Sequence, residues 1–203
     1  MNLLFKKQKN GQQASFINEE IGKSTYINID SNSELSKQIK IINLQKEDLV
    51  MLASLKPIIQ ANIEGIVSQF YKNLEHEGSL MNIIEDNSSV ERLKQTLMVH
   101  IQEMFDGRID QLFIDKRMKI AHIHFKIGLL PKWYMCAFQD LLLSLIALIN
   151  KHIHQQEEST KAMEAITKIL SLEQQLVLDA FQQENEQMYK KTGAGKRQAA
   201  PSN

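Results

Sequence analysis

Apolar residues recur three or four positions apart along most of the chain after about Leu44, which is the spacing of one face of an α-helix. Only three prolines and eight glycines interrupt the 203 residues. The pattern therefore predicts an all-α fold. We expect a short helix over residues 33–44 and longer helices over residues 57–74, 89–107, 110–128, 131–149 and 159–188.

Residues that begin and end helices lie at the edges of these stripes. Pro57 and Pro131 suit the first helical turn, where a missing amide hydrogen removes no bond. Ser88-Ser-Val-Glu91 has the form of a capping box, and Asp110 can cap the next helix. Gly128 is suited to the turn after that helix.

The two ends of the chain lack this periodicity. Residues 1–30 are polar and mixed, which predicts a flexible N-terminal arm, and residues 189–203 resemble a flexible polar tail. The tail contains Gly193-Ala-Gly-Lys196, which lacks the earlier glycine and the following Ser or Thr of a phosphate-binding loop. Residues 31–188 are thus expected to form one domain.

Composition narrows the classes of partner. The 24 basic and 24 acidic residues cancel, so no field of one sign favours nucleic acid or an anionic membrane. A single cysteine, Cys136, excludes an intrachain disulfide framework, fits a reducing compartment and is expected to be a small core residue. The apolar run at the N-terminus is too short for a signal peptide, and that of Leu141 to Ile149 is too short to span a bilayer. We expect a cytoplasmic location.

His124 is the strongest candidate for chemistry. On a helix it shares a face with Ile120, Ala121 and Ile127, so its imidazole should point into an apolar interior. There its second nitrogen needs a partner, which is either a backbone carbonyl or a metal, bare or inside a porphyrin. The local pattern leaves both alternatives open.

The other histidines are weaker candidates. His122 diverges from His124 by about 200° on a helix, so one ion cannot take both, and we expect His122 to be solvated. His152 and His154 fall near a helix end without neighbouring Cys or Asp residues and are expected to be exposed.

Three segments in order carry a family resemblance: Ile66-Val-Ser-Gln-Phe-Tyr-Lys-Asn-Leu74; Val90-Glu-Arg-Leu-Lys-Gln-Thr-Leu97 with His100-Ile-Gln-Glu-Met-Phe105; and the run around His124 through Lys132-Trp-Tyr-Met135. With them, residues 44–181 resemble the globin domain of globin-coupled sensors, and most closely the heme-based aerotaxis transducers of bacteria. The resemblance implies a globin-like fold with an extra N-terminal helix and two long last helices that form a dimer bundle.

The resemblance also implies a heme b site. His124 matches the proximal ligand of the iron, while Tyr71 and Thr96 match distal residues that face bound oxygen. Read without the resemblance, Tyr71 is a half-buried core residue and the Thr96 hydroxyl bonds the carbonyl of the preceding turn. Asn87 departs from the family, since close relatives have a histidine near a heme propionate at this position. The remaining residues matched to the heme pocket are Phe70, Leu93, Leu97, Ile120, Trp133 and Tyr134.

By resemblance, the chain is an oxygen sensor domain and not an enzyme, with carbon monoxide or nitric oxide as further ligands. Its signal would pass to a methyl-accepting signalling domain or another partner. The wide apolar arcs of the last two helices favour a homodimer, with Leu172 in the seam. One alternative is a heme-free interaction module of the same fold. A heme peroxidase or nitric-oxide dioxygenase is a weaker one, because Leu93 and Thr96 offer no distal His or Arg and no reductase domain is evident.

Overall fold

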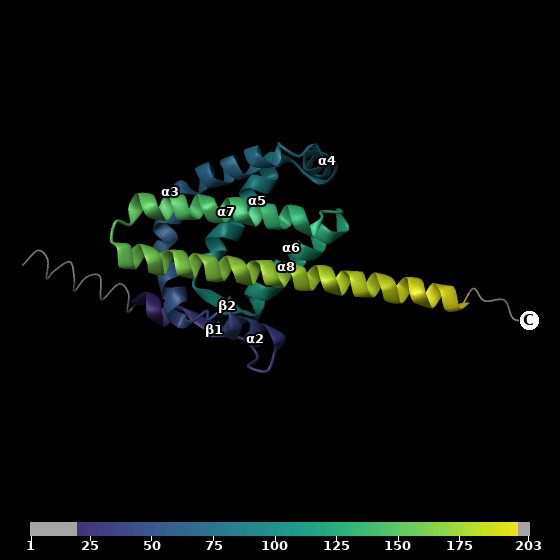
Figure 1. Ribbon diagram of the computed structural model, residues 1–203, viewed down its shortest axis with the longest axis horizontal. Coiled ribbons are helices and arrows are strands. Elements are labelled where there is room, and N and C mark those ends of the chain that lie inside the picture. The colour runs from purple at the N-terminus through teal and green to yellow at the C-terminus, as the bar shows by residue number, and fades with distance from the viewer. Residues whose placement is uncertain (1–19, 199–203) are drawn as a thin grey trace, which may run out of the picture.

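The computed structural model describes the backbone of residues 20–198 and the side chains of residues 20–191. Helices account for nearly all of its regular structure, and the predicted all-α, globin-like class is confirmed (Figure 1). The elements in chain order are β1 (Tyr26–Asn28), α2 (Glu34–Ile41), α3 (Lys46–Leu74), α4 (Gly78–Asn87), α5 (Val90–Met104), β2 (Arg108–Asp110), α6 (Gln111–Lys126), α7 (Pro131–His152) and α8 (Gln156–Gln198).

Most predicted helix starts are confirmed at the level of the capping side chain. Ser33 accepts a hydrogen bond from a backbone amide at the start of α2, and Asp110 does the same at the start of α6. Pro131 opens α7. The predicted capping box before α5 is one residue out of register, because Ser89, not Ser88, accepts from the backbone N of Arg92.

The predicted start of a helix at Pro57 is wrong, because α3 begins eleven residues earlier along the chain, at Lys46, and Pro57 lies inside it. At the true start the backbone N of Gln45 donates to Asp48 Oδ2 at 2.8 Å. A proline within a helix removes one backbone hydrogen bond. Apolar residues on both sides of Pro57 are buried in the same core, and the ribbon of α3 changes direction along its length (Figure 1).

The N-terminal arm was predicted to be flexible up to residue 30, which is wrong for the part that the structure describes. β1 pairs in parallel with β2, and the Tyr26 hydroxyl donates to Asp110 Oδ2 at 3.0 Å across 84 positions of sequence. Gly107, with φ of +68°, permits this approach, since a Cβ there would lie 2.6 Å from Thr25 Cγ2. Because the two paired strands are far apart in sequence, the local pattern of residues did not predict them.

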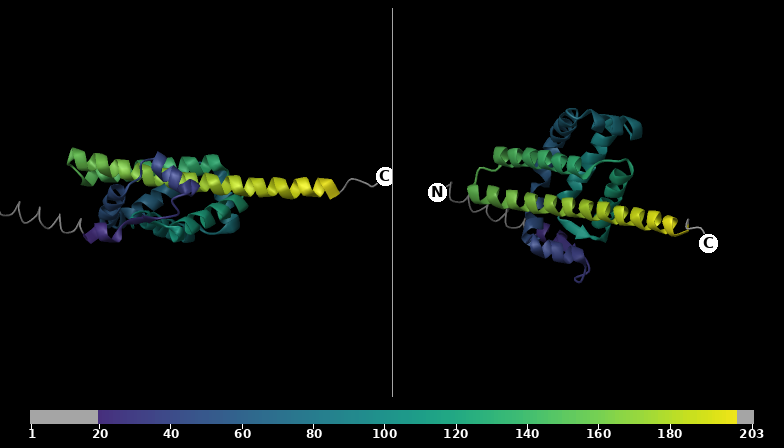
Figure 2. Two further views of the ribbon diagram at one scale, coloured as in Figure 1. Left: turned by 90° about the horizontal axis from the view of Figure 1, so that it is seen from below. Right: turned by 45° about the vertical axis from the view of Figure 1, so that its right-hand side comes forward.

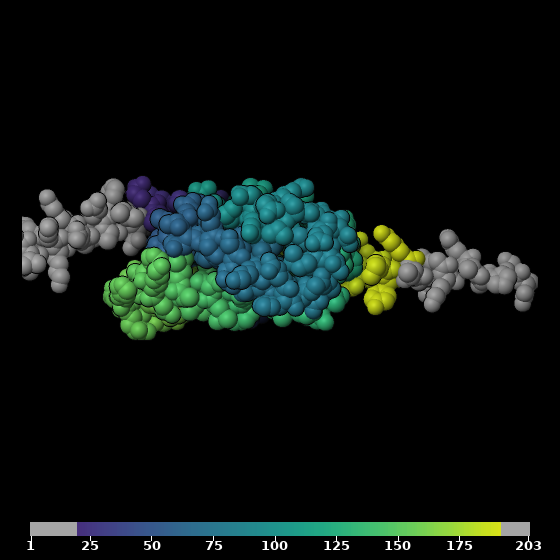
Figure 3. Space-filling model, turned by 90° about the horizontal axis from the view of Figure 1, so that it is seen from above, coloured from purple at the N-terminus to yellow at the C-terminus, as the bar shows by residue number. Residues whose placement is uncertain are grey.

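Two further differences concern helix extent. α4 was not anticipated, because its ten residues are too few to show a clear stripe. α8 continues to Gln198, through part of the segment predicted as a tail. Around Met188 the sequence consists mostly of Gln, Glu, Met and Lys, which form helices readily without being buried. The apolar stripe of α8 therefore ends before the helix does. The last part of α8 projects beyond the body of the protein (Figures 1 and 3).

The helices pack around α8, which contacts α3, α6 and α7. α7 and α8 lie side by side and antiparallel, joined by a short connection (Figures 1 and 2). Because three helices of the same chain cover α8, its wide apolar arc is buried within the subunit, and Leu172 is 0% exposed. The prediction that Leu172 lies in an intersubunit seam is therefore wrong.

α7 leaves apolar side chains on its outer face instead. Leu143 is 57% exposed, and Met135 and Cys136, at helical spacing from it, are also exposed. The expectation that Cys136 is a core residue is wrong, since its position on α7 faces away from α8 and α3. This outer face of α7 exposes Met135, Cys136 and Leu143 around Gln139, and the described chain does not cover it.

α3 and α7 have the length and apolar composition of membrane-crossing helices. The expectation of too short an apolar run considered only Leu141 to Ile149, whereas α7 as a whole passes this test. In the structure these two helices contact each other and both contact α8. Ile59 of α3 and Leu145 of α7 are each 0% exposed, as in the core helices of a globular domain.

Candidate functional site

His124 lies in the last turn of α6, on the face that points into the protein. Phe113, Arg117 and Ala121 precede it on this face and are all buried. The Nδ1 atom of His124 is buried and has no hydrogen-bond partner among the described residues. Burial, with a smaller contribution from nearby His100, lowers the pKa of His124 to about 4. The imidazole is therefore neutral at pH 7, which is the form that binds a metal.

Aromatic side chains of α7 border His124. The ring of Tyr134 meets the His124 ring edge to face, with centroids 5.5 Å apart. The Tyr134 ring also packs at a tilt against that of Phe138, with centroids 4.6 Å apart. Burial raises the pKa of Tyr134 well above its ordinary value, and the negative charge of Glu173 raises it further. Tyr134 thus keeps its proton, and the structure brings together two residues predicted for the same site.

Tyr71 and Phe70 lie near the end of α3, which packs against α5 and α7. Tyr71 is buried, and its ring meets that of Phe70 edge to face at 5.3 Å between centroids. Burial raises the pKa of Tyr71 to about 12. Its hydroxyl is therefore protonated throughout the neutral range and is able to donate a hydrogen bond.

α5 carries the other predicted distal residues. Thr96 is exposed, and its hydroxyl donates to the backbone carbonyl of Arg92 at 3.0 Å, which is the alternative that the sequence left open. Leu93 and Leu97 are partly buried and pack against the core. Asn87, at the end of α4, is exposed and donates through its amide to the carbonyl of Ile83 at 2.9 Å.

Two apolar residues expected in the pocket come from α6 and α7. Ile120 is half-buried on α6, one turn before His124. Trp133 is half-buried in the first turn of α7, with Lys132 Nζ 4.7 Å from its ring centroid. Both are thus near the α6–α7 turn, although neither has a described contact with His124.

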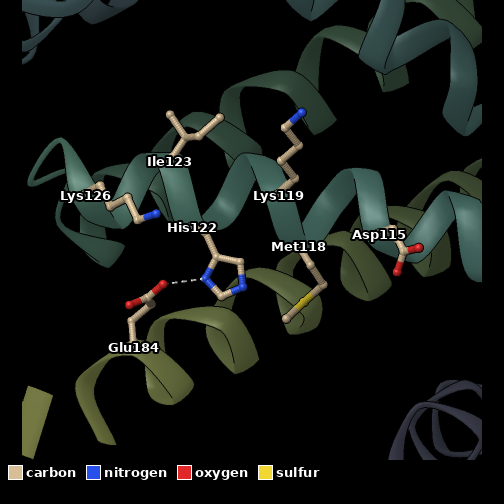
Figure 4. A pocket seen from close by; sticks show the side chains of 7 residues that line it. All are labelled: Asp115, Met118, Lys119, His122, Ile123, Lys126 and Glu184. Carbon is tan, nitrogen blue, oxygen red and sulfur yellow. Dashed lines mark ion pairs between the residues drawn. The ribbon is translucent and has the colours of Figure 1, made fainter. Parts of the chain in front are cut away.

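His122 points away from His124, toward α8. Its Nδ1 lies 2.9 Å from Glu184 Oε1, in a surface hollow between α6 and α8 (Figure 4). The expectation that His122 is solvated is corrected, because it is only 30% exposed and has a carboxylate partner. His152 and His154 are exposed, as predicted. The other residues that line the hollow are Asp115, Met118, Lys119, Ile123 and Lys126.

A buried ion network behind the site escaped the sequence analysis. We define it as His100 of α5, Arg117 of α6 and Glu173 of α8. Arg117 Nε donates to Glu173 Oε1 at 2.7 Å, and His100 Nε2 lies 3.2 Å from Glu173 Oε2. Arg117 Nη1 also donates to Glu103 at 3.1 Å. A charged residue within the apolar stripe of α8, next to Leu172, was the signal in the sequence.

The charges of the network stabilise one another in the core. Burial by itself raises the pKa of Glu173, but the charge and hydrogen bond of His100, together with Arg117, lower it more, so the net pKa is depressed. The Arg117 guanidinium also lies 3.6 Å from the ring centroid of Phe113. Glu173 therefore remains ionised although it is 0% exposed.

This chain belongs to the protoglobin family, whose sequence model matches residues 31–187. It is also similar in structure to the globin domain of a globin-coupled sensor from Geobacter sulfurreducens, with a TM-score of 0.68 and 24% identity, over 72% of this chain and 96% of that one. The predicted resemblance to globin-coupled sensors is thus confirmed.

A curated relative is the heme-based aerotactic transducer HemAT of Halobacterium salinarum. It is 22% identical to this chain over 159 residues, which cover 73% of this chain and 32% of the transducer. The chain therefore spans about a third of the length of this relative.

Proposed function

We propose that this chain is a heme-based gas sensor domain whose iron is held by His124. The observation that carries the proposal is the neutral, half-buried imidazole of His124 with a buried, unpartnered Nδ1, on the inner face of α6 in a protoglobin. Heme b would supply four porphyrin nitrogens and an iron atom with one open position for a gas. His124 would be the one side chain that holds this iron.

The residues around His124 fit a flat, apolar ligand. Tyr134 fixes one edge of the imidazole by ring contact, which orients the ligand nitrogen. Phe70, Leu93 and Leu97 are only partly buried, and Ile120 and Trp133 share this property. We propose that these side chains wall the heme and keep water from the iron.

The absorption spectrum of the purified protein tests the proposal. We expect a Soret band after reconstitution with hemin, and a shift of this band when oxygen or carbon monoxide is added to the reduced protein. Failure to take up heme would favour the heme-free interaction module of the same fold. Sustained turnover of peroxide or nitric oxide with a reductant would instead support a heme enzyme, which we do not expect.

Tyr71 is the better placed of the two proposed distal donors. Tyr71 is a buried side chain whose hydroxyl stays protonated, whereas the Thr96 hydroxyl already donates to Arg92. A hydrogen bond to bound oxygen contributes about 0.5 to 1.5 kcal/mol. Tyr71→Phe should therefore increase the oxygen dissociation rate by up to about tenfold and change carbon monoxide dissociation much less, since bound carbon monoxide is less polar.

Stopped-flow measurements on Tyr71→Phe and Thr96→Val separate the two donors. A larger effect of Thr96→Val would show that its hydroxyl leaves the Arg92 carbonyl when oxygen binds. Equal changes for oxygen and carbon monoxide in either variant would mean a steric effect and contradict the hydrogen bond.

We further propose that two subunits associate through the outer face of α7. This face exposes Leu143 together with Met135 and Cys136, and the resemblance places the last two helices at a two-fold axis. Leu143→Glu should yield a heme-binding monomer, because the side chain is 57% exposed and its replacement leaves the core intact. Sedimentation measures the change. A dimer that persists in this variant would place the interface elsewhere.

In this proposal the domain works in the cytoplasm and transmits its ligation state through α8. The named function of the transducer relative is aerotaxis, and its additional length leaves room for an output module. We propose that a methyl-accepting signalling domain, or a separate signalling protein, receives the signal of this domain.

A further inference from the structure

We infer that Glu173 is a positioning residue that couples the His124 site to α8. Its two carboxylate oxygens face two different helices: Oε1 accepts a hydrogen bond from Arg117 of α6, and Oε2 lies at ion-pair distance, 3.2 Å, from His100 Nε2 of α5. The inference rests on the proposed function, since the state to be transmitted is that of the heme iron. It adds a specific route by which this state reaches the helix that leads out of the domain.

One member of the network, Arg117, lies on the same helix as His124. Arg117 lies two helical turns before His124 on the same buried face of α6, so a displacement of this helix moves both side chains together. Arg117 is 1% exposed and Glu173 is 0% exposed, so neither has a path to solvent as the helix moves. A shift of α6 must therefore act on the carboxylate of α8.

A ring contact connects His124 with the surroundings of Glu173. The Tyr134 ring meets the His124 ring edge to face, with centroids 5.5 Å apart, and after burial the negative charge of Glu173 raises the pKa of Tyr134 further. Charges act strongly only over short distances, so Glu173 lies close to the side chain that borders His124.

The network has buried polar atoms without hydrogen bonds, which a rigid structural clamp does not need. Arg117 Nη2, His100 Nδ1 and Glu173 Oε2 are buried and have no hydrogen-bond partner among the described residues. Buried ion pairs are often replaced by apolar residues without loss of stability, so stability alone is a weak reason for this one. A network with unused donors allows a second arrangement of hydrogen bonds, which is the requirement for a two-state element.

α8 is suited to carry the displacement away. It is one continuous helix from Gln156 to Gln198, and it passes the site before it extends beyond the globular body (Figures 1 and 2). Glu173 connects α8 to α5 and α6 through His100 and Arg117. A change in these contacts would shift or rotate the whole projecting part of α8 as a rigid element.

Hydrogen exchange of the heme-loaded full chain tests the inference. Amide exchange along α8 after Glu173 is compared in the deoxy ferrous and carbon monoxide forms, after a Soret band has established heme binding. Coupling free energies of 1–3 kcal/mol correspond to ratios of about fivefold or more, and we expect such a ratio in the natural sequence. In Glu173→Gln we expect the ratio to fall below about twofold, with heme still bound.

Asp48→Asn is the matched control. It weakens another tether of α8, the 2.9 Å ion pair between Lys168 and Asp48 of α3, and leaves the network intact. Its ligand-dependent ratio should remain that of the natural sequence. The double variant Arg117→Met/Glu173→Met removes the charges together and provides a folded alternative if Glu173→Gln proves unstable.

The outcomes distinguish the two proposals. Absence of a Soret band in the natural sequence would refute the proposed function itself. With heme bound, the exchange ratio between the deoxy and carbon monoxide forms could instead persist in Glu173→Gln or in the double variant. That result would overturn only the proposed role of Glu173 and would leave the proposed function standing. The same holds if the natural sequence shows no ligand-dependent exchange in α8, or if Asp48→Asn loses the ratio equally.

Discussion

His124→Ala is expected to abolish stable heme binding while the helix content of the protein stays close to that of the natural sequence. The substitution removes the single protein nitrogen proposed to hold the iron, and alanine is a strong helix former in the last turn of α6. Titration with hemin followed by gel filtration measures the retained cofactor, and circular dichroism measures the helix content.

His122→Ala is the control two residues away. Its imidazole faces Glu184 on α8, so its loss should leave heme retention unchanged. If His124→Ala retained one heme per chain with an unaltered ferrous spectrum, the assignment of the proximal ligand would fail. If both variants lost heme equally, the cause would be a general disturbance of α6.

Arg117→Met is expected to lower the free energy of unfolding by about 3–5 kcal/mol, because it leaves the buried carboxylate of Glu173 without its permanently charged hydrogen-bond donor. Methionine fills a similar volume, so the loss of unfolding free energy measures the contribution of the Arg117 charge and its hydrogen bonds. Urea unfolding of the heme-free protein, followed by circular dichroism, provides the measurement.

Lys56→Met is the matched control for an exposed pair. Lys56 binds Asp106, and both side chains are more than a third exposed, so we expect a loss of at most about 1 kcal/mol. The double variant Arg117→Met/Glu173→Met should be more stable than Arg117→Met, since the unpaired carboxylate is gone. Additive losses in the double variant would show that the pair contributes no coupling energy.

Sequence alone identified the features that depend on neighbouring residues. Asp110 caps α6 by accepting from an amide three residues ahead, Pro131 presets the first turn of α7, and the cap of α5 is only one residue from the predicted one. The periodic stripes predicted an all-α fold for the same reason, because a helical face is defined within a few turns. The direction of His124 followed from that face, and ordered family segments gave it a proposed role.

Tertiary structure decided which of these faces are covered. The same apolar periodicity describes Leu172, which three helices bury, and Leu143, which is 57% exposed. Pro57 lies inside α3, where burial on both sides of it offsets a lost hydrogen bond, and Tyr26 of β1 bonds Asp110, 84 positions away. The neutral state of His124 and the meeting of Arg117 with Glu173 likewise depend on burial, which arises only when α5, α6 and α8 pack together.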